Sequence, residues 1–556
     1  MSSPEGSTTA EAVAARCLLC SVGCPVRALR VGPDQFVPDY VPHAGYVGLC
    51  GRGSVLVEWL DHPDRLRQAR RSAGGGRSDG GGGTGRTLPL KDAARRMADA
   101  VRGAESAVIV ADGNLDVDTL AAVGRFARDA GARWTACVTP GDAGLVHGLD
   151  ASRAELVGPE ALAEADAMLI VGDVFAAQPV ASHWIYAARD AHPRMPRLVI
   201  AGANTATAKF ATGQFEPVLG DGSAAAAVAA VRTGSTGGLP ADARGLAGWK
   251  QQLAAGQHPA IVVTAEGGYG EARALAGAVA ALAAEMGAMI CPLTACGNAW
   301  GAMRASAAEG GACPAEILRP GADVVLAIGC DLVSAYGLAV AGPLLDAARH
   351  VIYVGPMPNR TSDRASLVIP SAFAFEAPGR ALLGSDRLVA FGPLMPPPAG
   401  VPTVREILAL AGAAGATGAT GAPADVSAPC KAPQMPPSSG GRAGDGKGLM
   451  VAPASDPVHF GDGSLTGRAA WPRAVRPRPV LALAESDAEA AGLTDGHTAV
   501  VDGPGGSAEV EVVIRPDQRA GQATVTGAFA AVRDAFGWSW DGVRPGEAVR
   551  MQVHKP

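Results

Sequence analysis

Four cysteines near the N-terminus have the type and spacing that iron–sulfur chemistry requires. Cys17, Cys20 and Cys24 follow the pattern C-x2-C-x3-C, and Cys50 comes 26 residues after Cys24. A [4Fe-4S] cluster needs four thiolates, one for each iron. The closely spaced trio could bind three irons from one loop, and Cys50 could bind the fourth after the intervening chain folds back as a hairpin. We therefore predict a [4Fe-4S] cluster bound by these four residues.

Four cysteines in this spacing have two other uses. A structural zinc site also takes four cysteines, but such sites more often use two separated pairs than a trio and a distant single residue. Disulfides are the third alternative, and they persist mainly in oxidising compartments. The spacing favours the cluster, with zinc as the second choice.

The composition indicates a large globular protein that does not bind nucleic acid. A chain of 556 residues is too long for one core and predicts about three or four domains. The net charge is −6, so the chain lacks the overall excess of basic residues that is typical of proteins that bind nucleic acid. Aromatic residues make up 4% of the chain, which leaves few surfaces for stacking bases.

No targeting or membrane segment is visible in the sequence. Residues 1–15 are polar and acidic, without the apolar stretch of a signal peptide. The longest alanine-rich run, Ala274–Ala284, ends at Glu285, short of the roughly 20 apolar residues that a membrane span needs. We expect a soluble cytoplasmic protein whose ten cysteines are ligands or buried thiols.

The middle of the chain alternates short apolar runs with helical patterns. Apolar runs of four to six residues occur at 107–110, 167–171, 197–201, 260–264, 323–328 and 350–354. Such runs between helices, for example 90–102 and 116–130, predict parallel β-sheets covered on both faces. Most of the runs lead into a glycine at the carboxyl end of the strand, which is where open α/β sheets bind ligands. We expect two sheets, at about 87–232 and 255–410, or one interleaved pair.

The rest of the chain frames this α/β region. Strands near 26–29 and 35–37 and a helix near 54–60 are expected in the cluster domain, and five short strands from 481 to 553 predict a mixed β-barrel. The predicted order is a disordered lead (1–14), a [4Fe-4S] domain (15–68), a flexible link (69–86), α/β domains (87–410), a low-complexity linker (411–470) and the barrel (471–556).

These parts, in this order, resemble the molybdopterin oxidoreductases of the dimethyl sulfoxide reductase type. The resemblance rests on the cysteine motif with Cys50-Gly51-Arg52-Gly53, on the segment from Glu58 to Leu66, on the stretch from Thr361 to Arg387, and on Gly492-Leu493-Thr494-Asp495-Gly496 in the tail. It implies a small N-terminal [4Fe-4S] domain, Rossmann-like parallel-sheet domains and a C-terminal double-psi-like β-barrel that binds the dinucleotide. Two branches resemble the chain most. One is the B-type component of formylmethanofuran dehydrogenase, with a D-type component fused as the tail barrel. The other is the large iron–sulfur component (G-type) of NADH-quinone oxidoreductase.

The resemblance places the Mo or W ligand in Thr135-Ala136-Cys137-Val138-Thr139-Pro140-Gly141-Asp142, where active relatives carry a cysteine and a histidine. Here Thr139 stands at the cysteine position and Pro140 at the histidine position. Cys137 is two residues away and is the other candidate ligand. Arg52 corresponds to the basic residue that often lies between cluster and pterin, and it could equally tune the cluster potential by its charge or form a surface contact.

Other candidate residues rest on weaker patterns. Gly267, Gly268 and Gly270 form a glycine-rich turn between a strand and a helix, which could bind a phosphate group or could be an ordinary turn. Buried thiols are expected at Cys291, Cys296, Cys313 and Cys330, although the C-x4-C spacing of the first two could also bind a metal, and Cys430 is expected to be an ordinary thiol of the linker. The histidines at 147, 183 and 192 are expected at the surface or at helix ends.

We therefore predict an iron–sulfur electron-transfer subunit of a cytoplasmic multi-subunit oxidoreductase with a degenerate metal position. Its partners would be an electron donor or acceptor subunit that carries an iron–sulfur centre or a flavin. One alternative is an active enzyme that uses Mo or W on molybdopterin guanine dinucleotide to oxidise a formyl or formate-like group. The other is a non-redox scaffold of a formyltransferase/hydrolase-like complex.

Overall fold

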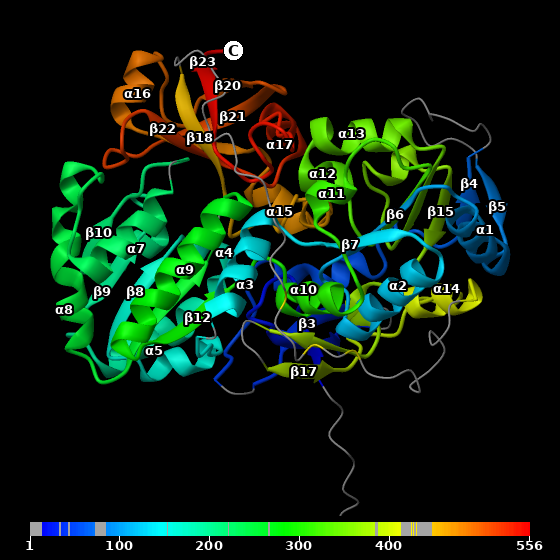
Figure 1. Ribbon diagram of the computed structural model, residues 1–556, viewed down its shortest axis with the longest axis horizontal. Helices are drawn as coiled ribbons and strands as arrows, with labels where there is room; N and C mark the ends of the chain where they lie inside the picture. Colours follow the sequence, from blue (N-terminus) through cyan, green and yellow to red (C-terminus); the bar gives the residue numbers. More distant parts are fainter. Residues whose placement is uncertain are drawn as a thin grey trace, which may run out of the picture.

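The computed structural model describes residues 14–32, 35–42, 45–72, 85–152, 154–220, 222–264, 267–383, 387–412, 424, 426, 430 and 448–556. Nearly all of the predicted lead, and the larger parts of the predicted link and linker, lie outside these residues. The chain forms two parallel-sheet units side by side, with a barrel over both of them (Figure 1).

The first sheet has seven strands and is built from two distant parts of the sequence. Its central strands are parallel, and the edge strands β4 and β5 are antiparallel. In spatial order they are β5 (Arg86–Leu88), β4 (Ala69–Arg71), β15 (Leu367–Pro370), β14 (His350–Gly355), β13 (Val324–Ile328), β6 (Ala107–Asp112) and β7 (Arg133–Cys137).

The second sheet has five parallel strands and is made by the chain between the two halves of the first. In order they are β10 (Gly213–Phe215), β9 (Arg197–Ile200), β8 (Ala167–Val171), β11 (Pro259–Thr264) and β12 (Met289–Leu293). Of the two arrangements expected from the sequence, the interleaved pair is therefore correct. Pairing β6 with β13 requires a contact between residues about 200 positions apart, which no local pattern reveals.

Helices cover both sheets as their apolar faces predict. The longer ones are α1 (Leu90–Arg102), α2 (Val117–Asp129), α3 (Pro140–Ser152), α5 (Ser182–Ala191), α7 (Ser223–Thr233), α9 (Tyr269–Met286), α10 (Ala299–Ala308) and α13 (Leu338–Ala347). Shorter ones are α4 (Val174–Ala177), α6 (Ala206–Lys209), α8 (Trp249–Ala254), α11 (Pro314–Ile317), α12 (Leu332–Tyr336), α14 (Val404–Leu410), α15 (Ala470–Val475), α16 (Glu485–Ala490) and α17 (Ala530–Ala535).

Helix α3 joins the two units by packing closely on α9. Gly144 and Gly148 lie one turn apart on the face of α3 that contacts α9. A Cβ atom on Gly144 would lie 2.3 Å from the Tyr269 carbonyl oxygen, and one on Gly148 would lie 2.4 Å from the Ala276 Cβ. Only glycine allows this approach of the two helix backbones.

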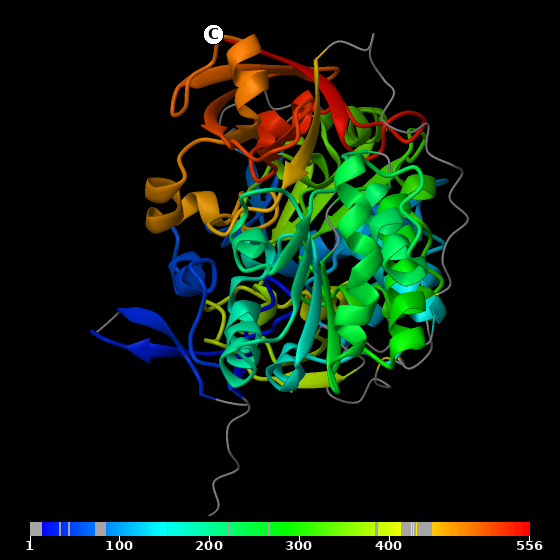
Figure 2. The ribbon, with the colours of Figure 1, turned by 90° about the vertical axis from the view of Figure 1, so that its left-hand side faces the viewer.

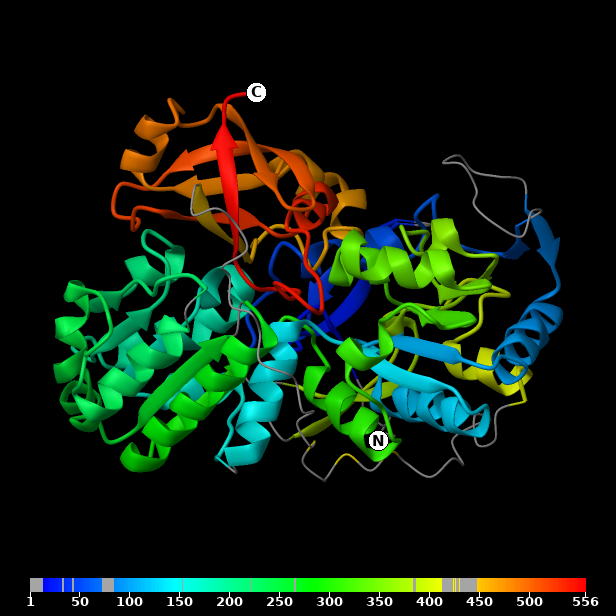
Figure 3. The same ribbon diagram turned by 45° about the horizontal axis from the view of Figure 1, so that its top comes forward.

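The C-terminal part closes into a six-stranded barrel above the carboxyl ends of both sheets (Figure 3). Its strands are, in order, β18 (Leu449–Ala454), β22 (Gln522–Thr526), β19 (Val480–Leu483), β21 (Gly506–Ile514), β20 (Thr498–Gly503) and β23 (Val549–His554). The five predicted strands are present. The sixth, β18, comes from the stretch 411–470 that was expected to be linker.

The N-terminal part is a small antiparallel sheet followed by a 3-10 helix. Its elements are β1 (Ala15–Arg16), β2 (Pro25–Arg30), β3 (Phe36–Tyr40) and η1 (Gly53–Trp59). Trp59 is fully buried and belongs to the same apolar core as Ile170 of β8 and Trp184 of α5. This part therefore shares the core of the second sheet, which compensates for its small size.

A buried ion pair joins this N-terminal part to the segment before α14. The Arg65 guanidinium donates from Nη1 to Glu376 Oε1 at 2.7 Å and from Nη2 to Oε2 at 2.5 Å. Glu376 also accepts a bond from the Phe373 amide at 2.7 Å. Both charged side chains are at most 1% exposed, so each depends on the other to offset the cost of leaving water.

In the described part of the chain, no helix is both long enough and apolar enough to span a membrane.

Loss of either partner of the buried Arg65–Glu376 ion pair should destabilise the fold strongly. Arg65→Leu or Glu376→Leu leaves a buried unpaired charge and should cost about 3–5 kcal/mol, whereas the double variant should recover much of this. The surface pair Arg67–Asp61 provides the control, because Arg67→Ala should cost less than about 1 kcal/mol. Urea unfolding midpoints of the four variants test this. A double variant as unstable as the sum of the singles would contradict it.

Candidate functional site

The structure brings the four predicted cluster ligands into one another's electrostatic range. Cys17, Cys20 and Cys24 are buried at 5, 8 and 5% exposure, and Cys50 is partly exposed. The Cys17 amide donates to the Cys24 carbonyl at 2.9 Å, which closes the loop. Burial raises the pKa of the Cys20 thiol to about 11, and the charge of Cys50 adds to this rise. Burial likewise raises the pKa of the Cys24 thiol, and the charges of Cys17 and Cys50 raise it further.

Arg52 lies beside these thiols and is buried at 5% exposure. Its charge lowers the pKa values of Cys17 and Cys20, so the guanidinium faces them. Its Nη2 atom donates to the carbonyl of Ala177, the last residue of α4, at 2.5 Å. Its Nε atom is buried without a hydrogen-bond partner among the described residues. A buried cation with a spare donor fits an anionic group bound by the thiolates.

Among the described residues, no group of three or more His, Cys, Asp or Glu side chains is placed to hold a metal ion. The cluster itself stays a prediction.

The cysteine loop is attached to a turn that lines a cavity. The turn, residues 294–298, follows β12. The Ser21 amide donates to the Thr294 carbonyl at 3.1 Å, and the Thr294 amide donates to Ser21 Oγ at 2.8 Å. A Cβ atom on Gly297 would lie 2.2 Å from the Leu18 carbonyl oxygen, so the loop and the turn are in direct backbone contact.

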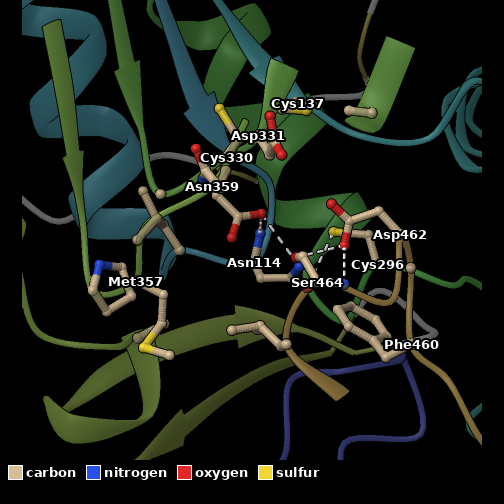
Figure 4. Close-up of a pocket in the computed structure, with 18 of the residues that line it drawn as sticks. Asn114, Cys137, Cys296, Cys330, Asp331, Met357, Asn359, Phe460, Asp462 and Ser464 are labelled. Carbon is tan, nitrogen blue, oxygen red and sulfur yellow. Dashed lines mark hydrogen bonds between the residues drawn. The ribbon is translucent and has the colours of Figure 1, made fainter. Parts of the chain in front are cut away.

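This cavity, called the first-sheet cavity here, has a volume of about 210 Å³. It lies at the carboxyl ends of β6, β7, β13 and β14 and is closed by the segment 460–465 that follows β18. Figure 4 shows Cys330 and Asp331 on one side, with Cys296, Asp462 and Ser464 on the other. The cavity thus lies at the strand ends, and ligand binding there stays a prediction.

The first-sheet cavity is acidic. Burial raises the pKa of Asp112 to about 6, against the hydrogen bonds from Asn114 that lower it. Burial also raises the pKa of Asp331, and the charge of Asp462 adds to this. The two guanidinium groups in the lining are occupied: Arg533 donates to four backbone carbonyls, and Arg468 donates to the Pro358 carbonyl. The lining therefore opposes an anionic group more than it attracts one.

The two candidates for the metal position have different environments. The Cys137 side chain lines the first-sheet cavity at the end of β7, and its hydrogen bond raises the pKa of the neighbouring Cys330 thiol. Thr139 also lines this cavity, but it caps α3 as well, because its Oγ accepts a bond from the Asp142 amide at 3.1 Å. Pro140 is the first residue of that helix. The threonine oxygen is thus engaged in holding the helix.

A second cavity of about 200 Å³ lies between the second sheet and the barrel. It contains Gly267, which has φ +104°, but Gly268 packs against Glu547 of the barrel, since a Cβ there would lie 2.4 Å from the Glu547 Cγ. The Glu271 carboxylate accepts from the Gly268 amide at 3.4 Å. This carboxylate occupies part of the place expected for phosphate, and a Cβ on Gly270 would meet no atom within 4 Å. Phosphate binding by this turn stays a prediction.

One buried pair was missed by the sequence analysis. His147, expected at the surface, is 3% exposed, and its Nδ1 lies 2.9 Å from the Tyr269 hydroxyl across the α3–α9 contact. Both line a third cavity of about 100 Å³, together with Cys313 and Trp540. The signal available in the sequence was the small-residue spacing of α3, which brings the two helices together. Cys291, Cys296 and Cys330 are buried thiols, as expected.

Comparison with known proteins supports the fold and no more. No protein-family model and no curated protein matches the sequence. Among solved structures, acetylene hydratase from Pelobacter acetylenicus matches with a TM-score of 0.64 and 13% identity, over 98% of this chain and 100% of that chain. At this identity the likeness shows that the chain shares the overall fold of that protein.

The buried histidine should make the protein sensitive to acid. Burial lowers the pKa of His147 to about 4 from its usual 6.5, so the folded state disfavours the protonated form. The resulting stability is present above about pH 6.5 and is lost as the pH falls toward 4. Between pH 7.5 and 5.0, wild type should lose about 2 kcal/mol more than His147→Gln.

Urea midpoints at the two pH values measure this difference. Tyr269→Phe is the matched control, because it removes the hydroxyl but keeps the histidine buried and should keep the acid sensitivity. Equal losses in wild type and His147→Gln would contradict the prediction.

Proposed function

We propose that this chain is an iron–sulfur electron-transfer subunit of a multi-subunit oxidoreductase. The observation that carries the proposal is the direct contact between the cysteine loop and the wall of the first-sheet cavity, through Ser21 and Thr294. A [4Fe-4S] cluster held by Cys17, Cys20, Cys24 and Cys50 would accept and release one electron at a time. Partner subunits follow from the proposal, because a single centre can only pass its electron on.

The residues around the cluster would control its exposure to water, its reduction potential and the protonation of its ligands. Burial of the Cys17–Cys24 loop excludes water from three of the four thiolates. The Arg52 charge partly offsets the negative charge of the thiolates and favours the reduced state. Because burial holds the thiols in their protonated form, binding of iron must supply the free energy to deprotonate them.

The environment of the metal position favours a relay over a molybdenum or tungsten enzyme. Thr139 is used as a helix cap, and Pro140 cannot replace the histidine of active relatives. The carboxylates of Asp112, Asp331 and Asp462 would repel the phosphates of a pterin dinucleotide. The residues of this cavity therefore fit such a group poorly.

A single observation favours the second candidate, an active enzyme on a formyl or formate-like group. Cys137 presents a thiol to the first-sheet cavity, and this cavity and the one over the second sheet lie under the same barrel. In that case Cys137 would bind Mo or W, and the two cavities would hold molybdopterin guanine dinucleotide.

Metal content distinguishes the candidates. Anaerobically purified protein should contain about four Fe per chain without Mo or W. Cys20→Ser should lose most of the iron and the electron paramagnetic resonance signal of the reduced cluster, whereas Cys313→Ser, which changes a thiol far from the loop, should keep both. One Zn and no Fe would contradict both redox candidates and leave the scaffold.

Replacement of the candidate ligand gives an independent test. Under the relay proposal, Cys137→Ala and Thr139→Ala should leave the iron content and the cluster signal unchanged, and Thr139→Ala should cost about 1 kcal/mol of stability through the lost helix cap. Retention of one Mo or W by wild type, and its loss in Cys137→Ala alone, would reverse the ranking of the two candidates.

A further inference from the structure

Exposed apolar side chains occur on the N-terminal part of the chain and on α15, which contacts the loop of the least buried of the four cysteines. Ten large apolar side chains are exposed in the described part of the chain, and six of them belong to the β2–β3 hairpin, the loop that ends at Cys50, and the segment of α15. The six, called the docking face here, are Leu29, Val31, Val37, Val47, Trp471 and Val475. Figure 2 shows the hairpin, η1 and α15 on the same side of the molecule.

The hairpin contributes apolar surface that its own fold does not need. Leu29 and Val37 are paired across the two strands and are 39 and 41% exposed, and Val31 follows on the same face at 59%. The hairpin projects from the body (Figure 2). A two-stranded ribbon buries little by itself, so exposed β-branched and leucine side chains on its face indicate a surface that another protein covers.

Trp471 places the other half of the docking face directly on the cluster loop. A Cβ atom on Gly51 would lie 2.3 Å from the Trp471 Cη2, so the indole lies against the backbone next to Cys50. The indole is nevertheless 42% exposed, and Val475, one turn further, is 52% exposed. Cys50 is the one cluster ligand that is not fully buried. Trp471 and Val475 thus belong to a helix that contacts the loop of Cys50, the most exposed of the four predicted ligands.

The basic residues around α15 indicate that the surface of the partner is acidic. Residues 468–479 contain four arginines and no acidic residue, in a chain with a net charge of −6. Arg473 and Arg478 are exposed, whereas Arg468 and Arg476 pair with Asp64 and Asp456. The neighbouring Glu58 accepts a bond from the Ala470 amide at 3.0 Å. An apolar centre flanked by unpaired basic charge is complementary to an acidic surface.

We propose that the docking face binds a small acidic protein that carries a one-electron redox centre near its surface. The inference rests on the proposed function and names the class of its partner. On docking, the partner centre loses one electron and the cluster beside Cys50 gains it, and no bond is made or broken. Trp471 and Val475 provide the desolvated contact, and Arg473 and Arg478 attract the acidic partner and should make association faster at low salt.

Stopped-flow reduction of the iron-loaded protein by an acidic [2Fe-2S] ferredoxin tests this. The variant Arg473→Glu/Val475→Ser changes two exposed side chains of α15. Its second-order rate constant should fall about tenfold at low salt and lose most of its dependence on ionic strength. Reduction of this variant by dithionite, which needs no docking, should keep the wild-type rate. Trp471→Ala should likewise slow the ferredoxin reaction.

The matched control lies on α1 and α14. Leu410→Ser/Arg96→Glu also removes one exposed apolar side chain and reverses one exposed arginine, and it should react as wild type does. Wild-type ferredoxin rates in both docking-face variants would overturn the proposal while the cluster signal upholds the proposed function. Absence of the cluster signal in wild type would overturn both. A dimer of this chain that the docking-face variants dissociate would show a second copy as the occupant and overturn the acidic partner.

Discussion

The turn 294–298 is the structural constraint on which the candidate site depends. It is held from three directions: by Ser21 of the cysteine loop, by Asn114 after β6, whose Oδ1 accepts from the Gly297 amide at 2.9 Å, and by Asp142 of α3, whose carboxylate accepts from the Ala295 and Cys296 amides at 2.9 and 2.8 Å. Burial raises the pKa of Asp142 to about 6, and these bonds lower it in part. One short turn therefore holds the cysteine loop in place relative to both sheets.

This arrangement connects the buried thiols and the first-sheet cavity through one turn. The thiols face Arg52 and the core of the second sheet, where water is excluded. The first-sheet cavity lies on the other side of the turn, at the strand ends and under the segment after β18. The docking face lies on the thiol side, beside Cys50.

Local patterns were sufficient for the individual elements. The helix expected at 90–102 is α1 over the same residues, and the strand expected at 167–171 is β8, because an amphipathic stripe and an uninterrupted apolar run are each decided by neighbouring residues. The burial of His147 was not foreseen, since it depends on a glycine-mediated contact of α3 with α9 across more than a hundred residues. The strand β18 was not foreseen either, because its pairing partners β22 and β23 lie far along the chain.

The sequence by itself was enough to identify the four cysteines as a candidate ligand set. Local periodicity was enough to predict the alternation of strands and helices and the change to β-structure in the tail. Contacts between distant segments settled which strands share a sheet, that Cys137 reaches a cavity, and that Trp471 lies over Gly51. These outcomes depend on packing between parts of the chain that can be hundreds of residues apart, where close backbone approach and the burial of charge are determined only by the complete fold.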